Sequence, residues 1–338
     1  MDGESAIALL EADADRASAS VFATAVPRGR LRERVVSAVS DDDLGADGID
    51  LEAFLEEEDT AGLLCSWFGA EPLRGMPLRD ARSLRLRIDR DIAALDTLIS
   101  EQLDAILHHR KFKQLEATWR GVSFLLDQAE GDDKVVIRLL STTWKELGRD
   151  FDRSAEFDQS ALFAKVYSEE FGTPGGLPYG LLLCDHSVRH RHGGADSSDD
   201  IGTLSRLGEV AAASFAPCVV GAAPELFGVS TFAELSHVQH IDAGFRLAEY
   251  QRWRRLQEKE ESRFLGVGLP RILLRGLHDG AREQREGFVY SEQALGIEGW
   301  LWGNAVYGFG AVVIRAFRES GWFADIRGAR EGVFGAGR

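Results

Sequence analysis

Side chains that could bind a metal or take part in catalysis are concentrated in one short stretch of the chain. Cys184, Asp185 and His186 are consecutive, and His190 and His192 follow shortly after. Thiolate, carboxylate and imidazole groups are side chains that bind zinc in proteins. Their spacing matches no standard zinc motif, and the residues after His192 have the composition of a solvated loop. A metal-dependent enzyme that uses Cys184, His186, His190 and His192 therefore stays open only as an alternative.

Signatures of other kinds of catalysis are missing from the sequence. It contains no G-x-S-x-G, H-E-x-x-H or G-x-x-x-x-G-K-[ST] motif. Gly303, Gly308 and Gly310 lie in an apolar run with Trp302 and Tyr307, where close packing is a more natural role than phosphate binding. The favoured interpretation therefore has no catalytic residue, no metal and no cofactor.

Composition and charge argue against nucleic acid and the membrane as binding partners of this chain. Residues 1–60 contain 16 acids and 5 arginines, so −11 of the net charge of −16 lies there, and the remaining 39 acids and 34 bases nearly balance. A basic face is therefore not expected, which argues against nucleic acid as a partner. The sequence has no run of about 18 apolar residues and no signal peptide at its start. We expect a cytoplasmic protein without direct membrane insertion.

Two helices are predicted ahead of the Cys184 region. Between residues 80 and 109, apolar residues recur every three or four positions, which predicts a long helix with one apolar face. They are Leu84, Ile88, Ile92, Leu95, Ile99, Leu103 and Ile106. After a corner at His108 and His109, a second helix is predicted from Phe112 to just before Gly131. We expect the two helices to form a hairpin with a broad apolar seam.

Strands and helices are predicted to alternate from about residue 131 onward. Short apolar or β-branched runs predict strands at 134–140, 179–184 and 218–221. The predicted helices are 143–151, 158–170, 204–215, 241–260 and 300–319. Such alternation is typical of α/β folds. We therefore expect an α/β (mixed α+β) fold, in which a long helical hairpin precedes a mixed sheet flanked by helices.

The predicted organisation has three parts. Residues 1–75 form an acidic N-terminal arm and helical region, 76–130 the helical hairpin, and 131–338 the α/β domain. The low apolar content of the arm is compatible both with a semi-independent element and with a solvated terminus.

Five motifs carry a resemblance to a known family. They are Leu115-Glu-Ala-Thr-Trp-Arg-Gly121, Ala223-Pro-Glu-Leu-Phe-Gly228, the run from Trp253 to Arg275 with S-R-F-L-G and L-P-R-I-L-L-R, Leu301-Trp-Gly-Asn-Ala305, and Gly321-Trp-Phe-Ala-Asp-Ile-Arg-Gly328. In type and order they resemble the large subunit of the contractile sheath of bacterial type VI secretion systems (the TssC, VipB or EvpB family). The resemblance covers about residues 80–328, and none of the motifs is a catalytic signature.

The resemblance implies a structural protein with a contractile-sheath-like fold. Family members pair with the small sheath subunit (TssB or VipA), and the pairs polymerise with further copies around an inner tube protein. Contraction ejects the tube, and a ClpV-type ATPase disassembles the contracted sheath. Members usually continue well past the motif that ends at Gly328, whereas this chain stops at Arg338. A truncated or diverged sheath paralogue that binds the small subunit without polymerising is therefore a second alternative.

The motifs also supply candidate interface residues. The segment from Trp253 to Phe264 carries dense charge of both signs, which is typical either of a solvated helix face or of a seam between subunits. The candidates are Trp119, Arg120, Gly121, Pro224, Glu225, Phe227, Trp253, Arg254, Arg255, Glu258, Glu260, Arg263, Pro270, Arg271, Trp302, Asn304, Trp322 and Arg327.

Overall fold

The computed structural model describes residues 57–68, 81–130, 134–190, 199–280, 287–293, 296–323 and 326. The chain divides into two compact units, of which unit 1 comprises Met1–Lys113 with Leu277–Gly299, and unit 2 comprises Gln114–Gly276 with Trp300–Arg338. The division falls near the start of helix α7 (Arg110–Ala129). Most of the acidic arm lies outside the described residues, and the three-part organisation stays a prediction.

Unit 1 contains the helices α4 (Thr60–Phe68) and α6 (Ala81–Leu107) and the short 3-10 helix η7 (Ile297–Gly299). The indole N–H of Trp67 in α4 donates to Asp91 Oδ2 of α6 at 2.9 Å. The predicted long helix at 80–109 is confirmed, but none of the α6 side chains that the structure describes is buried. Its apolar face is therefore open to further packing. The predicted hairpin of α6 with α7 stays a prediction.

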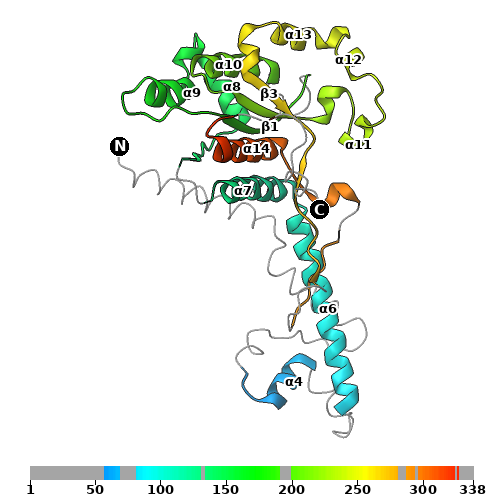
Figure 1. The fold of residues 1–338 in the computed structure, drawn as a ribbon. Coiled ribbons are helices and arrows are strands. Elements are labelled where there is room, and N and C mark those ends of the chain that lie inside the picture. Colours follow the sequence, from blue (N-terminus) through cyan, green and yellow to red (C-terminus); the bar gives the residue numbers. More distant parts are fainter. Residues whose placement is uncertain are drawn as a thin grey trace. The chain divides into compact units, whose positions relative to one another are not determined.

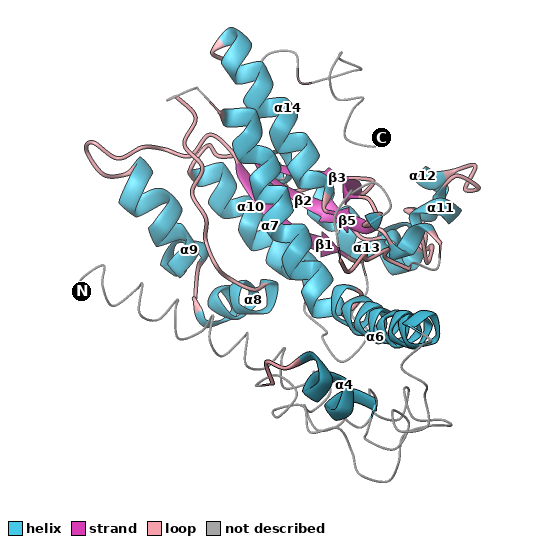
Figure 2. Ribbon diagram, turned by 90° about the horizontal axis from the view of Figure 1, so that it is seen from below, coloured by secondary structure: helices cyan, strands magenta, loops and turns pink. Residues whose placement is uncertain are grey.

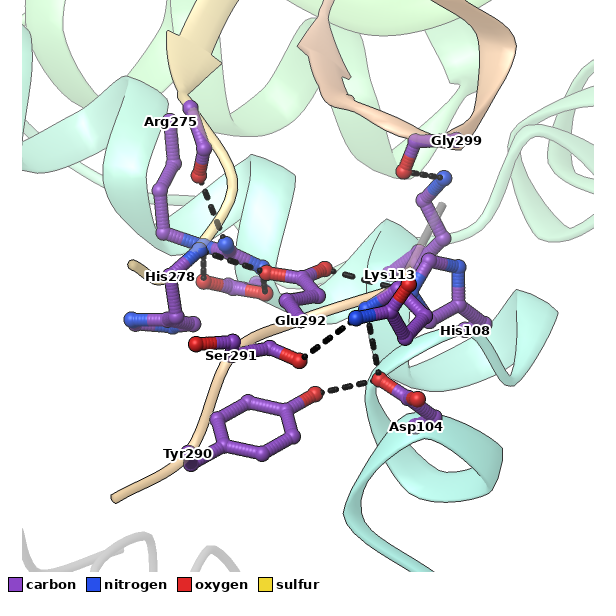
Figure 3. A network of polar contacts seen from close by, with 12 residues as sticks. Asp104, His108, Lys113, Arg275, His278, Tyr290, Ser291, Glu292 and Gly299 are labelled. Atoms are coloured by element: carbon purple, nitrogen blue, oxygen red, sulfur yellow. Dashed lines mark hydrogen bonds and ion pairs between the residues drawn. The ribbon is translucent and has the colours of Figure 1, made fainter. Parts of the chain in front are cut away.

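Polar contacts in unit 1 fasten the segment 277–299 to the end of α6 (Figure 3). Asp104 Oδ1 accepts a hydrogen bond from the Tyr290 hydroxyl at 2.5 Å. Glu292 Oε1 lies 3.2 Å from His108 Nε2, and Glu292 Oε2 accepts the backbone N–H of His278 at 3.0 Å. The Glu292 side chain is almost fully buried, so these bonds offset the cost of removing its carboxylate from water.

The centre of unit 2 is a parallel sheet in the order β1–β2–β3. Its strands are β1 (Leu182–Val188), β2 (Cys218–Ala222) and β3 (Leu265–Gly268). Leu182 pairs with Cys218, and Cys218 pairs with Leu265. A separate antiparallel pair consists of β4 (Ile272–Arg275) and β5 (Leu301–Gly303).

Helices cover both faces of this sheet (Figures 1 and 2). On one side, Cys218, Val220 and Ala222 of β2 join a core that includes residues of α8 (Trp144–Arg153) and α10 (Asp200–Ala213). On the other side, Val219 packs with residues of α7 and α14 (Ala305–Ser320). All five β2 residues are buried, as expected for a parallel strand with helices on both faces.

Short elements complete unit 2. They are η1 (Phe157–Gln159), α9 (Ala161–Phe163), the π-helix η2 (Ala164–Phe171), η3 (Pro224–Phe227), α11 (Phe232–Leu235), α12 (Ile241–Gly244), η4 (Ala248–Tyr250), α13 (Gln251–Gln257) and η5 (Glu260–Phe264). The predicted α/β fold class is confirmed, as are the helices expected near 143–151, 158–170 and 204–215.

The prediction of a strand at 134–140 is wrong. These residues form a loop that pairs with no strand in the described part of the chain. Ile137 packs against the core beside α7 and α14, whereas Val136, Leu139 and Leu140 are exposed. Strand propensity reflects packing against neighbouring strands, and this segment has none there.

Three other boundaries differ from the prediction. The helix expected at 241–260 is broken, because the extended backbone at Leu247 separates α12 from η4 and α13. The helix expected at 300–319 begins only at Ala305, after β5 and the extended Asn304. The strand expected from residue 179 begins at Leu182.

Candidate interaction surface on helix α7

The inner face of α7 is packed tightly against unit 2. Gly121, Val122 and Leu125 are buried, and a Cβ atom at Gly121 would lie 2.5 Å from the ring of Tyr307 in α14. That distance is too short for any carbon contact. Gly121 is therefore needed for the close approach of the two helices.

A carboxylate joins α7 to the strand β4. Glu116 Oε1 accepts a hydrogen bond from Arg275 Nε at 2.8 Å and one from Arg120 Nε at 2.7 Å. Both partners of the Glu116–Arg275 pair are largely buried, with side chains 13% and 11% exposed. Burial raises the pKa of Glu116, but the hydrogen bonds and charges of Arg275 and Arg120 outweigh it and hold that pKa below its usual value.

A second carboxylate joins α7, β1 and α14. Asp185 Oδ2 accepts hydrogen bonds from the hydroxyls of Thr118 at 2.5 Å and Tyr307 at 2.7 Å. Burial, and then the nearby charge of Asp185, raise the pKa of Tyr307 far above its usual value. The phenol therefore keeps its proton and remains a hydrogen-bond donor.

Asn304 fixes the start of α14 against β1. Its Oδ1 accepts the backbone N–H of Val306 at 3.1 Å, which caps the helix, and its Nδ2 donates to the carbonyl of His186 at 3.0 Å. The carboxamide lies so close to Gly221 of β2 that a side chain there would collide with it. The predicted candidates Gly121 and Asn304 thus act inside the fold.

The outer face of α7 presents three large apolar side chains to solvent. Leu115, Trp119 and Leu126 are 54%, 60% and 53% exposed, and their spacing of four and seven residues places them on one side of the helix. We call these three residues the α7 stripe. Large exposed apolar groups that share one face are typical of protein–protein contact sites.

Several candidates from other motifs have structural contacts. Trp253 is buried, and Arg254 Nη1 donates to the carbonyls of Phe245 and Leu247 at 2.7 and 2.8 Å. The Arg271 guanidinium lies over the rings of Phe232 and Trp302, at 5.7 and 5.8 Å from their centroids. These contacts stabilise unit 2.

The Ala223–Gly228 motif has contacts of the same kind. Pro224 begins η3, the ring of Phe227 packs edge-on against Phe245 at 5.9 Å, and Glu225 lies 3.9 Å from Arg189. Pro270, from the motif between Trp253 and Arg275, follows a cis peptide bond and is exposed. Of these four candidates, the Glu225 carboxylate and Pro270 are accessible enough for a role at a surface.

Other candidates are accessible. Arg255, Glu258, Glu260 and Arg263 are exposed. Arg263 Nε donates to the carbonyl of Glu260 at 3.0 Å, and its Nη2 lies 3.9 Å from Glu260 Oε1. Trp322 is 71% exposed. Arg327 lies outside the described residues.

Four residues that organise this region were not among the predicted candidates: Glu116, Asp185, Arg275 and Tyr307. Glu116 and Arg275 stand within the motifs that carry the family resemblance, so those motifs contained a signal for them. Nothing local in the sequence indicates that Arg275 meets a residue far back in the chain. Asp185 was considered only as part of a metal site.

In the described part of the chain, the residues of the alternative metal site make other contacts. The Cys184 sulfur lies 3.8 Å from that of Cys218, His186 stacks on Trp144, and His190 stacks on Tyr250. Among the described residues, no three or more His, Cys, Asp or Glu side chains come together as metal ligands. His192 lies outside them.

None of the described helices is long and apolar enough to cross a membrane.

Comparison with known proteins places the chain. Residues 89–336 match the VipB family model, described as EvpB/VC_A0108, tail sheath N-terminal domain. The chain is also 34% identical over 249 residues to the type VI secretion system sheath protein TssC1 of Pseudomonas aeruginosa, a match that covers 72% of this chain and 49% of that protein. The chain spans about half the length of this curated relative. It belongs to the VipB (TssC) family of type VI secretion sheath proteins.

Proposed function

We propose that this chain is a structural subunit of a type VI secretion contractile sheath in the cytoplasm. It pairs with the small sheath subunit, and the pairs assemble with further copies around the inner tube protein. Contraction of the sheath ejects the tube, and a ClpV-type ATPase then acts on the contracted sheath. The subunit contributes surfaces and stored packing energy to this cycle, not a chemical reaction.

The observation that carries the proposal is the exposed large apolar side chains on the helices α6 and α7. Leu115, Trp119 and Leu126 of the α7 stripe are exposed, whereas Gly121, Val122 and Leu125 of the same helix are buried in unit 2. In unit 1, Ile92 and Ile99 of α6 are also exposed. Large apolar side chains exposed along one side of a helix are typical of contact sites, and an assembling subunit buries them against its neighbours.

The mixed-charge segment after Trp253 is proposed as a seam between subunits. Arg254 is unsuitable for testing this, because its bonds to Phe245 and Leu247 stabilise the fold. Reversal of the exposed Arg255 and Glu258 is the cleaner test. Sheaths that remain intact with both charges reversed would exclude the seam.

The proposal is tested by co-expressing the chain with the small sheath subunit. Affinity purification and negative-stain microscopy are expected to yield hollow tubes. A stable complex without tubes would instead favour the paralogue that binds but does not polymerise. The absence of any complex would refute the proposal.

A further inference from the structure

We infer that an acidic segment of this chain, residues 41–56, binds to the start of helix α6 in the same molecule. The surface consists of the exposed side chains between residues 82 and 92, which we call the α6 face. They are Arg82, Arg85, Leu86, Asp89, Arg90 and Ile92. The segment and the helix both belong to unit 1.

The α6 face is basic, although the whole chain has a net charge of −16. Its three arginines and one aspartate give a local charge of +2. Within the described part of the chain, none of these three guanidinium groups has an ion pair or a hydrogen bond. They can therefore bind carboxylates of another segment.

Two large apolar side chains lie among these charges. Leu86 and Ile92 are 61% and 49% exposed. Covering them removes apolar area from water, which favours a contact that includes apolar side chains of the partner. The segment that fits the α6 face therefore combines carboxylates with apolar residues.

Residues 41–56 have this combination. The segment contains seven acids and no lysine or arginine. Its large apolar residues are Leu44, Ile49, Leu51, Phe54 and Leu55. Residues 1–40, by contrast, contain six acids and five arginines, so they have little net charge with which to attract arginines. Charge complementarity therefore assigns the contact to residues 41–56.

The segment is also near α6 along the chain. It ends just before α4, in which Trp67 donates to Asp91 of α6 at 2.9 Å. From Thr60 to Trp67, α4 rises about 10 Å, and an extended chain of the length of residues 41–56 spans up to about 50 Å. The α6 face is only about 15 Å long, so the segment can reach all of it.

A second copy of the chain carries the same acidic segment. A segment in the same molecule, however, competes at an effective concentration on the order of millimolar. In dilute solution the α6 face therefore binds the segment of its own chain.

This contact makes residues 41–56 a removable cover for α6. The consequence rests on the proposed function, in which exposed apolar side chains of α6 are buried against neighbouring subunits. A segment that binds the same side chains competes with those neighbours, so it delays assembly until it is displaced.

A photo-crosslinker on the α6 face identifies its occupant. Leu86 is replaced by p-benzoylphenylalanine in the full chain, and a dilute mixture of isotope-labelled and unlabelled protein is irradiated without any partner. Digestion at Asp and Glu separates residues 41–56 from α4, and mass spectrometry locates the crosslink. The expected product joins position 86 to residues 41–56, with the same label on both peptides. A crosslink to any other part of the chain, a product of mixed label, or no crosslink would overturn the inference.

Leu177 provides a matched control position. It is 59% exposed and lies in unit 2. The same crosslinker at position 177 is expected to give no product with residues 41–56. A product as abundant as that from position 86 would mean that the segment binds without preference, and would overturn the assignment to α6.

Charge reversal tests the electrostatic part of the contact. Arg82→Glu/Arg85→Glu, added to the crosslinking variant, is expected to lower the yield of the product by roughly fivefold or more. The control is Arg149→Glu/Arg153→Glu, which makes the same change of charge at exposed arginines of α8 and is expected to leave the yield unchanged. Circular dichroism establishes that both variants are folded. Equal yields from the two would contradict binding through the arginines of α6.

Assembly tests the cover separately. Asp50→Asn/Glu52→Gln/Glu56→Gln weakens the segment's hold on α6 and is expected to speed tube formation with the small subunit, as measured by light scattering. An unchanged rate would overturn the cover. If no tubes form with the unmodified chain, the proposed function and the cover both fail, whereas the binding of residues 41–56 to α6 is decided by the crosslink in the chain alone.

Discussion

Single residues in unit 2 show which contacts the fold depends on. Gly121→Ala places a methyl group against the ring of Tyr307 and is expected to destabilise the chain by about 1–3 kcal/mol. Gly244→Ala is the control, because no atom lies within 4 Å of a Cβ there. Chemical denaturation of both variants measures the difference. Equal stability would mean that α7 and α14 can separate without cost.

Glu116 makes stability depend on pH. Because the pKa of Glu116 is lower in the folded chain than its usual value, its contribution is present above the unfolded pKa of about 4.3. It is lost as the pH falls through the lower folded pKa. Glu116→Gln is expected to cost about 1–3 kcal/mol at pH 7 and less in acid. Urea unfolding at several pH values would contradict this if the cost were constant.

The sequence indicated some of these residues and not others. Gly121 and Asn304 stand in motifs that resemble the family, so their importance was predictable, although their role proved to be internal packing. The pairing of Glu116 with Arg275 was not predictable, because the two residues are separated by 159 positions in the sequence. Periodicity reports on near neighbours only.

At the scale of elements, helices were predicted best where apolar spacing was regular. α6, α7 and α10 follow that spacing. The prediction of one helix at 241–260 was wrong, because the extended backbone at Leu247 interrupts it. The start of α14 is set by the cap at Asn304. An asparagine directly before an apolar helical run was the available signal for that boundary.

The loop at 135–140 gives a prediction for hydrogen exchange. None of these residues has a backbone hydrogen bond in the described part of the chain, whereas β2 is paired on both sides. Amide protons at 135–140 are expected to exchange far faster than those of Val219 and Val220. Mass spectrometry of the isolated chain measures both. Slow exchange at 135–140 would require a partner for this segment.

At the scale of the whole molecule, the strong negative charge affects the rate at which a charged partner associates with the chain. A basic partner is attracted to a chain of net charge −16, and salt screens that attraction. The association rate with a basic partner is expected to fall by about tenfold or more between low and high ionic strength. Stopped-flow measurements test this. A rate insensitive to salt would argue against an electrostatic role of the chain's acidity.

The fold class of the whole chain was predictable, because short apolar runs and helical periodicity indicate the alternation of strands and helices locally. The division into two units was not predictable from such local patterns. Residues 277–299 belong with the N-terminal residues rather than with β4 and β5 on either side of them. The polar contacts of Asp104 and Glu292 with that segment have no periodic signal in the sequence.

The exposed apolar residues of the loop at 135–140 also affect how the protein can be handled. Val136, Leu139 and Leu140 lie in a β-prone run whose backbone groups are unpaired among the described residues. Such a run is a template for cross-β aggregation when the chain is concentrated by itself. Expression without its assembly partners is therefore expected to lower the yield of soluble protein, and Leu139→Lys is expected to raise it.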